Sequence, residues 1–149
     1  IDGFFIIIRT SWVFSSFKNN FVKKILKSTK DKKFLTIVDD QYGGPTSAFD
    51  LANVCKKIVN KLICGQGKKG IYHYAGQPNI NRADFVREIL KLSNFDILVK
   101  SVSSKNFNQS AIRPLNSRLD CSDIERVYDI KRSDWRVDLH YVLKDILKF

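Results

Sequence analysis

The sequence predicts a mixed α/β fold, and two observations indicate it. Strand-like segments, which are continuously apolar or alternate between apolar and polar residues, alternate along the chain with segments of helical periodicity. In addition, 44% of the 149 residues are hydrophobic, which is enough for a buried core and argues against a disordered chain. No internal repeat or low-complexity linker interrupts residues 1–149, so the sequence shows no domain boundary.

The first strand is predicted in the run FFIIIRTSWVF, residues 4–14, which has the composition of a strand buried on both faces. A helix follows in NNFVKKILKSTKD, residues 19–31, with Phe21 and Ile25 on its inner side. The short run FLTIV, residues 34–38, predicts a second strand that leads into a loop.

That loop, DDQYGGPTSAFDLA at residues 39–52, is interpreted first as a structural corner and second as a wall that faces a ligand. The Gly-Gly-Pro sequence at 43–45 turns the chain, and the hydroxyl residues after it begin a helix. Asp39 and Asp40 are adjacent at a strand end, so their side chains should diverge and do not suit an acid/base pair. The free N–H groups of the helix start favour an anion nearby.

The helix after this corner is strongly amphipathic, and Ser47 with Asp50 has the spacing of a capping box. Its apolar stripe is formed by Leu51, Val54, Cys55, Ile58, Val59 and Leu62.

The sequence GQGKKG at 65–70 matches the dinucleotide pattern G-x-G-x-x-G, but its neighbours are in the wrong order. The pattern needs a strand before the glycines and a helix after them. Here a helix ends at Cys64 and the strand-like GIYHYAG, residues 70–76, follows. We therefore reject a cofactor site at this position and interpret Gly65 as a helix C-cap.

The remaining segments continue the alternation. A helix capped by Asn81 is predicted over 81–93, a strand over 95–102 and an extended segment over 113–121, because the residue before a proline avoids helical angles. Ser122 and Glu125 suggest a capping box for a short helix to Tyr128, and a final helix begins at Asp134. The predicted inner residues of the two longer helices are Phe85, Ile89 and Leu92, and then Trp135, Leu139, Val142 and Ile146.

The formal net charge is +11, but the lysines are scattered in pairs, so a solvated basic surface is favoured over a dedicated polyanion site. Three cysteines without a CxxC pair predict buried, reduced thiols in a cytosolic protein, with Cys55 on an apolar helix stripe. Two distant histidines give no support for a metal site. The apolar run near the start is too short for a membrane span and lacks a signal-peptide cleavage pattern.

Two absences suggest that the chain is part of a longer protein. It has no methionine and opens within a predicted strand. No tyrosine is followed four residues later by lysine, so the catalytic Tyr-x-x-x-Lys pattern of short-chain dehydrogenases is missing, and no local motif indicates a Ser-His-Asp or Cys-His site. We expect an N-terminal part to precede this chain.

Four segments in order carry a family resemblance: RTSWVF (9–14), NNFVKKIL (19–26), DDQYGGPTSAFDLA (39–52) and AIRPLNSRLD (111–120). Together they resemble the C-terminal half of the dTDP-4-dehydrorhamnose reductase family, within the extended short-chain dehydrogenase/reductase superfamily. The resemblance covers essentially all 149 residues. It implies the C-terminal part of an NAD(P)-binding Rossmann-like fold, with its late strands and a small substrate-binding domain.

The resemblance also implies an activity for the parent protein. Hydride passes from NADPH to the C4 ketone of dTDP-4-dehydro-L-rhamnose, a tyrosine supplies the proton, and dTDP-L-rhamnose is formed for cell-surface polysaccharide. The main NADPH site and the catalytic residues would lie in the absent N-terminal half, so this chain alone is predicted to be inactive. The implied partners are the dTDP-sugar, that N-terminal half and a second copy in a homodimer, in the cytoplasm, with no nucleic acid or membrane.

Seven residues become site candidates through the resemblance. Trp12 would pack near the sugar, or be a core tryptophan. Arg113 would pair with phosphate, since its guanidinium matches phosphate oxygens, or form an ordinary salt bridge; Arg118 is a second choice. Asn20 would meet the diphosphate or only cap its helix. The full set is Trp12, Asn20, Gln41, Thr46 and Arg113 for substrate, and Thr10 and Ser11 for cofactor or sugar.

One departure from the family concerns magnesium, which some members bind at a dimer interface through acidic residues. Phe49 aligns with one such position and cannot bind a cation, although Asp134 could match another. Metal-dependent dimerisation is therefore not expected. Two other functions stay open: a non-catalytic relative like the regulatory subunit of methionine adenosyltransferase, and, ranked last, a basic nucleic-acid-binding module that lacks a recognised motif.

Overall fold

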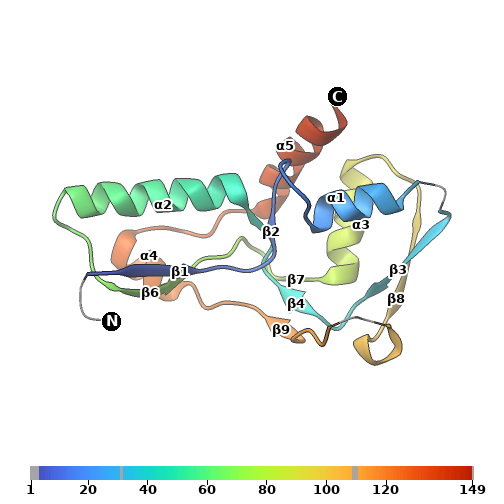
Figure 1. Ribbon diagram of the computed structural model, residues 1–149, viewed down its shortest axis with the longest axis horizontal. Helices are drawn as coiled ribbons and strands as arrows, with labels where there is room; N and C mark the ends of the chain where they lie inside the picture. Colours follow the sequence, from blue (N-terminus) through green and yellow to red (C-terminus); the bar gives the residue numbers. More distant parts are fainter. Residues whose placement is uncertain (1–3, 31, 109–110, 149) are drawn as a thin grey trace.

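The computed structural model describes residues 4–30, 32–108 and 111–148 and confirms the mixed α/β class. The molecule is elongated, with one group of elements at each end and short strands between them (Figure 1). The helices are α1 (Phe21–Ser28), α2 (Ala48–Ile63), α3 (Arg82–Leu92), α4 (Ser122–Tyr128) and α5 (Trp135–Leu147), with a 3₁₀ turn η1 (Ser104–Asn106). The strands are β1 (Ile6–Arg9), β2 (Val13–Phe14), β3 (Phe34–Val38), β4 (Tyr42–Gly43), β5 (Thr46–Ser47), β6 (Gly70–His73), β7 (Ile80–Asn81), β8 (Leu98–Val102) and β9 (Asn116–Ser117).

One end of the molecule is built on β1 and β6, which are parallel and pair from Ile6↔Gly70 to Arg9↔His73. Helices α2 and α4 pack against this pair. We call the resulting cluster the β1–β6 core; its buried members are Val54, Ile58, Tyr72, Tyr74, Ala75, Cys121, Ile124, Tyr128 and Ile130.

The expectation that the first strand is buried on both faces is wrong for the described chain. Exposed and half-buried residues alternate along β1, and Ile7 and its cross-strand partner Ile71 remain 40% and 47% exposed. The chain provides apolar cover for only one face of this sheet, so the other face keeps its isoleucines in solvent.

The other end is built on the parallel pair β3–β8, with α1, α3 and α5. Phe85 lies at its centre, 1% exposed, and its ring contacts those of four other aromatic residues. We call this cluster the Phe85 core; its buried members are Phe14, Val22, Ile25, Leu26, Leu35, Phe85, Val86, Ile89, Leu90, Trp135, Leu139 and Leu143.

Short strands join the two ends. The pair β2–β5 is parallel, and β4 lies between β7 and β9 in a three-stranded sheet. These strands hold the corner at residues 39–47 between the two cores (Figure 1). Gly44 and Gly76 lie so close here that a Cβ on Gly44 would come within 2.6 Å of the Gly76 carbonyl oxygen. The corner is therefore closely packed structure, as the glycines predicted.

Helix caps were predicted with mixed success. Asn20 and Asn81 cap α1 and α3, each accepting a hydrogen bond from a backbone N–H three residues later. The capping box proposed for α4 is wrong: Cys121 is the N-cap without a side-chain bond, and Asp120 accepts from the Ser122 N–H. The Glu125 N–H, which a Ser122 cap would have satisfied, donates instead to the Cys121 carbonyl at 3.3 Å.

The cysteine prediction is correct only in part. Cys121 is buried, whereas Cys55 and Cys64 are exposed, and the described residues contain no disulfide. In α2 the buried stripe is Val54 and Ile58, with Leu51 and Leu62 partly buried. Cys55 lies beside this stripe on the outer side, because one helix packed on a narrow sheet buries fewer positions than the sequence pattern offered.

A partly buried polar network fixes the start of α2 to the segment before α5. Asp50 accepts hydrogen bonds of 2.6 Å from both the Tyr74 and the Ser133 hydroxyl groups. The Ser47 hydroxyl accepts from the Asp50 N–H at 3.5 Å, so the predicted capping box forms only in part and the Asp50 carboxylate serves the network instead. Tyr74 is 1% exposed, which makes its hydroxyl dependent on these partners.

This network predicts a loss of stability at high pH. Burial, followed by the hydrogen bond to Asp50, raises the pKa of Tyr74 from 10.0 to about 12. Between these values the folded state holds a proton that the unfolded chain has released, so the free energy of unfolding should fall as the pH rises from 10 to about 12. In the Tyr74→Phe variant, the free energy of unfolding, measured by urea denaturation at several pH values, should fall less over this pH range. Tyr141→Phe, whose ring is 66% exposed, should keep the parent's slope, and an equal change in both variants would contradict the assignment.

Candidate functional site

Two adjoining hollows lie beside the corner, between the two cores. The Trp12 hollow, of about 440 Å³, is bordered by Thr10, Ser11, Trp12, Asn116 and Ser117. The Phe21 hollow, of about 430 Å³, is bordered by Asn19, Asn20, Phe21, Lys24, Ile37 and Phe107. Gln41, Arg82 and Arg113 line both hollows. Six of the seven predicted site residues therefore line one continuous region, although they come from separate parts of the chain.

Trp12 is held in an unusual backbone conformation at the edge of this region. Its φ of 48° lies in the left-handed region, which bulky residues rarely adopt. The Trp12 carbonyl accepts a hydrogen bond from the Thr46 N–H, and the neighbouring Ser11 hydroxyl donates to the Gly44 carbonyl at 3.1 Å. Backbone strain of this kind persists only where surrounding contacts enforce it, and it is common at binding sites.

The indole of Trp12 contacts both backbone and charge. A Cβ on Gly43 would lie 2.5 Å from Trp12 Cε2, so only glycine lets β4 approach the ring this closely. The guanidinium carbon of Arg82 lies 3.7 Å from the ring centroid. In this structure a guanidinium therefore covers the indole where a sugar was expected, and the sugar contact of Trp12 stays a prediction.

Thr10 and Ser11 follow directly after β1, at the carboxyl end of the parallel pair β1–β6, where open α/β sheets bind ligands. The Thr10 hydroxyl oxygen is buried and has no hydrogen-bond partner among the described residues. The Ser11 hydroxyl is already bonded to Gly44. Of these two hydroxyl groups, that of Thr10 is therefore the one with hydrogen-bonding capacity left for a ligand.

Asn20 caps its helix and also borders one of the two hollows. Its side-chain oxygen accepts from the Lys23 N–H, and its amide nitrogen donates to the Ser15 carbonyl at 2.7 Å. The same residue lines the Phe21 hollow. Its capping role is thus established by geometry, while a contact with a ligand stays a prediction.

Gln41 and Thr46, both from the corner, differ in position. Gln41 is 3% exposed, lines both hollows and donates from its amide nitrogen to the Ser104 hydroxyl at 3.0 Å. Thr46 is fully buried and borders neither hollow; its hydroxyl donates to the Gly44 carbonyl and accepts from the Gly76 N–H at 3.2 Å. Thr46 therefore packs behind the residues that line the hollows and holds the corner to the Gly76 segment.

Arg113 is exposed and lines both hollows, as its proposed role requires. Within residues 4–30, 32–108 and 111–148, the ion pairs involve Arg87, Arg126 and Arg136, so the salt bridge considered as the alternative for Arg113 does not form. Arg118 donates to the Asn116 side chain and borders neither hollow.

Arg82 was missed by the sequence analysis. It is the first residue of α3, and its guanidinium stands over the rings of Trp12 and Phe21. Burial, and then the charge of Arg113, lowers the pKa of Arg82 from its ordinary value to about 10. The group is still charged at neutral pH. Arg82 and Arg113 line the same region, and no carboxylate of the described residues borders it, so the region is attractive to an anion.

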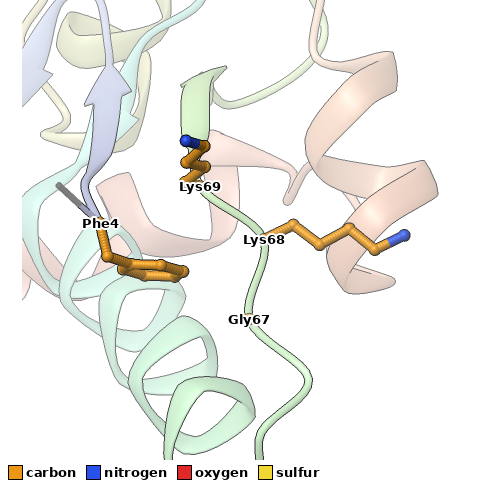
Figure 2. A pocket seen from close by; sticks show the side chains of 4 residues that line it. All are labelled: Phe4, Gly67, Lys68 and Lys69. Carbon is orange, nitrogen blue, oxygen red and sulfur yellow. The ribbon is translucent and has the colours of Figure 1, made fainter. Parts of the chain in front are cut away.

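Other sequence features do not converge on a site. Lys68 and Lys69 border a shallow hollow with Phe4 and Gly67, and Figure 2 shows their side chains extending in different directions. The GQGKKG segment lies between α2 and β6, in the order that led us to reject it. No group of three or more potential metal ligands occurs in the described parts of the chain. Likewise, none of their helices is long and apolar enough to cross a membrane.

The fold is that of the C-terminal part of extended short-chain dehydrogenases/reductases. Within that class, the chain belongs to the RmlD substrate binding domain family, which it matches over residues 3–148.

Individual relatives agree with this assignment. The dTDP-4-dehydrorhamnose reductase of Aggregatibacter actinomycetemcomitans is 39% identical over 138 residues, which are 88% of this chain and 47% of that protein. A crystal structure of a dTDP-4-dehydrorhamnose reductase ortholog from Clostridium acetobutylicum superposes with a TM-score of 0.84 at 32% identity, over 97% of this chain and 49% of that one. The Bacillus anthracis enzyme in complex with NADP gives 0.82 at 26% identity, over 92% and 46%. The chain thus spans about half the length of these relatives.

Proposed function

We propose that this chain is the substrate-binding half of an NADPH-dependent dTDP-4-dehydrorhamnose reductase. The observation that carries the proposal is the region shared by Gln41, Arg82 and Arg113, in a chain whose family is defined by substrate binding. The reaction is the reduction of the C4 ketone of dTDP-4-dehydro-L-rhamnose to dTDP-L-rhamnose, a precursor of cell-surface polysaccharide.

In this proposal the residues described here bind and orient the substrate. The diphosphate lies at Arg113, and the sugar lies in the Trp12 hollow, whose Asn116 and Ser117 side chains suit sugar hydroxyl groups. Holding the sugar in place keeps its C4 carbon at a fixed position for reaction. The tyrosine that protonates the carbonyl oxygen belongs to the N-terminal half of the protein.

NADPH, when bound, supplies the hydride, and its main site lies in the same N-terminal half. The fit of this chain to the cofactor rests on Thr10, whose buried hydroxyl lacks a partner among the described residues at the carboxyl end of β1. A nicotinamide carboxamide can both donate to and accept from such a hydroxyl group. Thr10 and Ser11 would border the cofactor there.

The N-terminal half would dock on the exposed side of the β1–β6 pair. Within the described chain β1 pairs only with β6, so its other edge carries backbone groups without strand partners. Ile7 and Ile71 on the open face would become buried by the same contact. A larger parallel sheet completed in this way is covered on both faces, as parallel sheets generally are.

The activity is tested by measuring NADPH consumption with dTDP-4-dehydro-L-rhamnose. The protein as its gene encodes it, with whatever precedes Ile1, should consume NADPH in proportion to the substrate added, whereas the 149-residue chain should not. Consumption by the chain alone would show that the catalytic groups had been misplaced. A full gene product that binds dTDP without consuming NADPH would favour the non-catalytic alternative instead.

A further inference from the structure

Arg82 has a backbone that is fixed on both sides. Its N–H donates to the Gln41 carbonyl at 3.1 Å, and the preceding Asn81 pairs with Tyr42 across β7 and β4. Asn81 also caps α3, with its side-chain oxygen 2.8 Å from the Asp84 nitrogen. The Cα of Arg82 therefore has a defined position beside the corner.

The side chain of Arg82 is fixed by aromatic rings. Its guanidinium carbon lies 3.7 Å from the Trp12 ring centroid and 4.6 Å from that of Phe21. Both rings pack in turn on Phe85, at centroid distances of 6.3 and 5.9 Å, and Phe85 lies one helical turn after Arg82. A guanidinium held in this way loses little freedom when it binds a ligand.

Stacking uses the faces of the guanidinium and leaves its in-plane N–H donors available. Arginine has five such donors, yet none from Arg82 meets an acceptor among the residues that the structure describes, and none is paired with a carboxylate there. Arg113 lines the same two hollows, and its charge, after burial, helps to lower the pKa of Arg82.

The two arginines stand where the hollows meet, and the two sides differ in chemistry. Hydroxyl and amide groups of Ser11, Asn116 and Ser117 border the Trp12 side. Phe21, Ile37 and Phe107 give the other side a more apolar lining. A ligand with a polar end, a doubly charged middle and an aromatic base fits this order, and a nucleoside diphosphate sugar has that form.

We propose that Arg82 is a second phosphate-binding residue, which holds the diphosphate of the nucleotide together with Arg113. The inference rests on the proposed function and adds a residue to its site. It makes the paired arginines a selector for a diphosphate over a monophosphate, because the diphosphate brings more charge and more acceptor oxygens to two guanidinium groups.

The test compares the affinities of thymidine, dTMP and dTDP for Arg82→Gln, in the protein as its gene encodes it. Glutamine keeps a polar side chain, although a shorter one, and removes the charge. We expect dTDP to bind about 10- to 100-fold more weakly, the range for a lost hydrogen bond to a charged group, with thymidine unchanged and dTMP affected less. Arg82→Lys should recover only part of the loss, because lysine keeps the charge without the planar fork.

Arg87→Gln is the matched control, since Arg87 lies on the same helix and pairs with Asp84 away from the hollows. It should bind all three ligands like the parent protein. Unchanged dTDP affinity in both Arg82 variants would overturn this inference and leave the proposed function intact. Equal weakening of thymidine and dTDP would also overturn it, by showing that Arg82 acts through packing. If the parent protein fails to bind dTDP, the proposed function fails as well.

Discussion

Replacing Phe85 with alanine should lower the free energy of unfolding by about 3–5 kcal/mol, the range for a large aromatic residue lost from a core. The ring is 1% exposed and contacts Trp12, Phe14, Phe21 and Trp135, at centroid distances between 5.2 and 6.3 Å. Alanine leaves a cavity among four rings that are themselves fixed by strands and helices, so the surroundings can close it only in part. Chemical denaturation of the variant and the parent measures the difference.

The same substitution should affect the site, because Trp12 and Phe21 pack against Phe85 and stack on the Arg82 guanidinium. Phe85→Ala is therefore expected to weaken dTDP binding even at temperatures where the variant is folded. Phe49→Ala is the control: its ring is 72% exposed, and the change in unfolding free energy should stay within about 0.5 kcal/mol. Similar losses in the two variants would mean that Phe85 is not the centre of this core.

Arg113→Ala should weaken dTDP binding by about 1.5–3 kcal/mol, the range for hydrogen bonds to a charged group. Arg113 is exposed and lines both hollows, so its removal takes away charge without creating a cavity. Folding stability should consequently change little. Titration calorimetry with dTDP would measure the change in binding free energy.

Arg118→Ala provides the comparison within the same segment. Its guanidinium donates to Asn116 at 2.9 Å and borders neither hollow, so the affinity for dTDP should stay close to that of the parent. If Arg118→Ala weakens binding as much as Arg113→Ala, the effect is a general one of surface charge. If Arg113→Ala leaves the affinity unchanged, Arg113 does not hold the phosphate.

Features that depend on local chemistry could be predicted from the sequence. Asn20 and Asn81 were identified as helix caps because the bond joins residues only three positions apart. The order of helix, loop and strand around GQGKKG excluded a false cofactor motif for the same reason. The turn at 43–45 was equally clear, since glycine and proline restrict the chain by themselves.

Features that depend on distant partners could not be predicted. Arg82 gains its position from residues 12, 21 and 85, and only tertiary packing brings these to one place. The outward position of Cys55 depends on how wide a surface α2 covers. The exposed face of β1 depends on what else packs against it, and a strand's own residues do not reveal that.

The contact between Arg82 and Trp12 has a practical consequence for spectroscopy. The chain has two tryptophans, and Trp135 is fully buried, with its indole N–H donating to the Pro78 carbonyl. A nucleotide that draws the guanidinium away from Trp12 would alter the emission of one indole and leave the other as a constant background. Intrinsic fluorescence therefore gives a label-free titration signal, because Trp12 itself lines the candidate site.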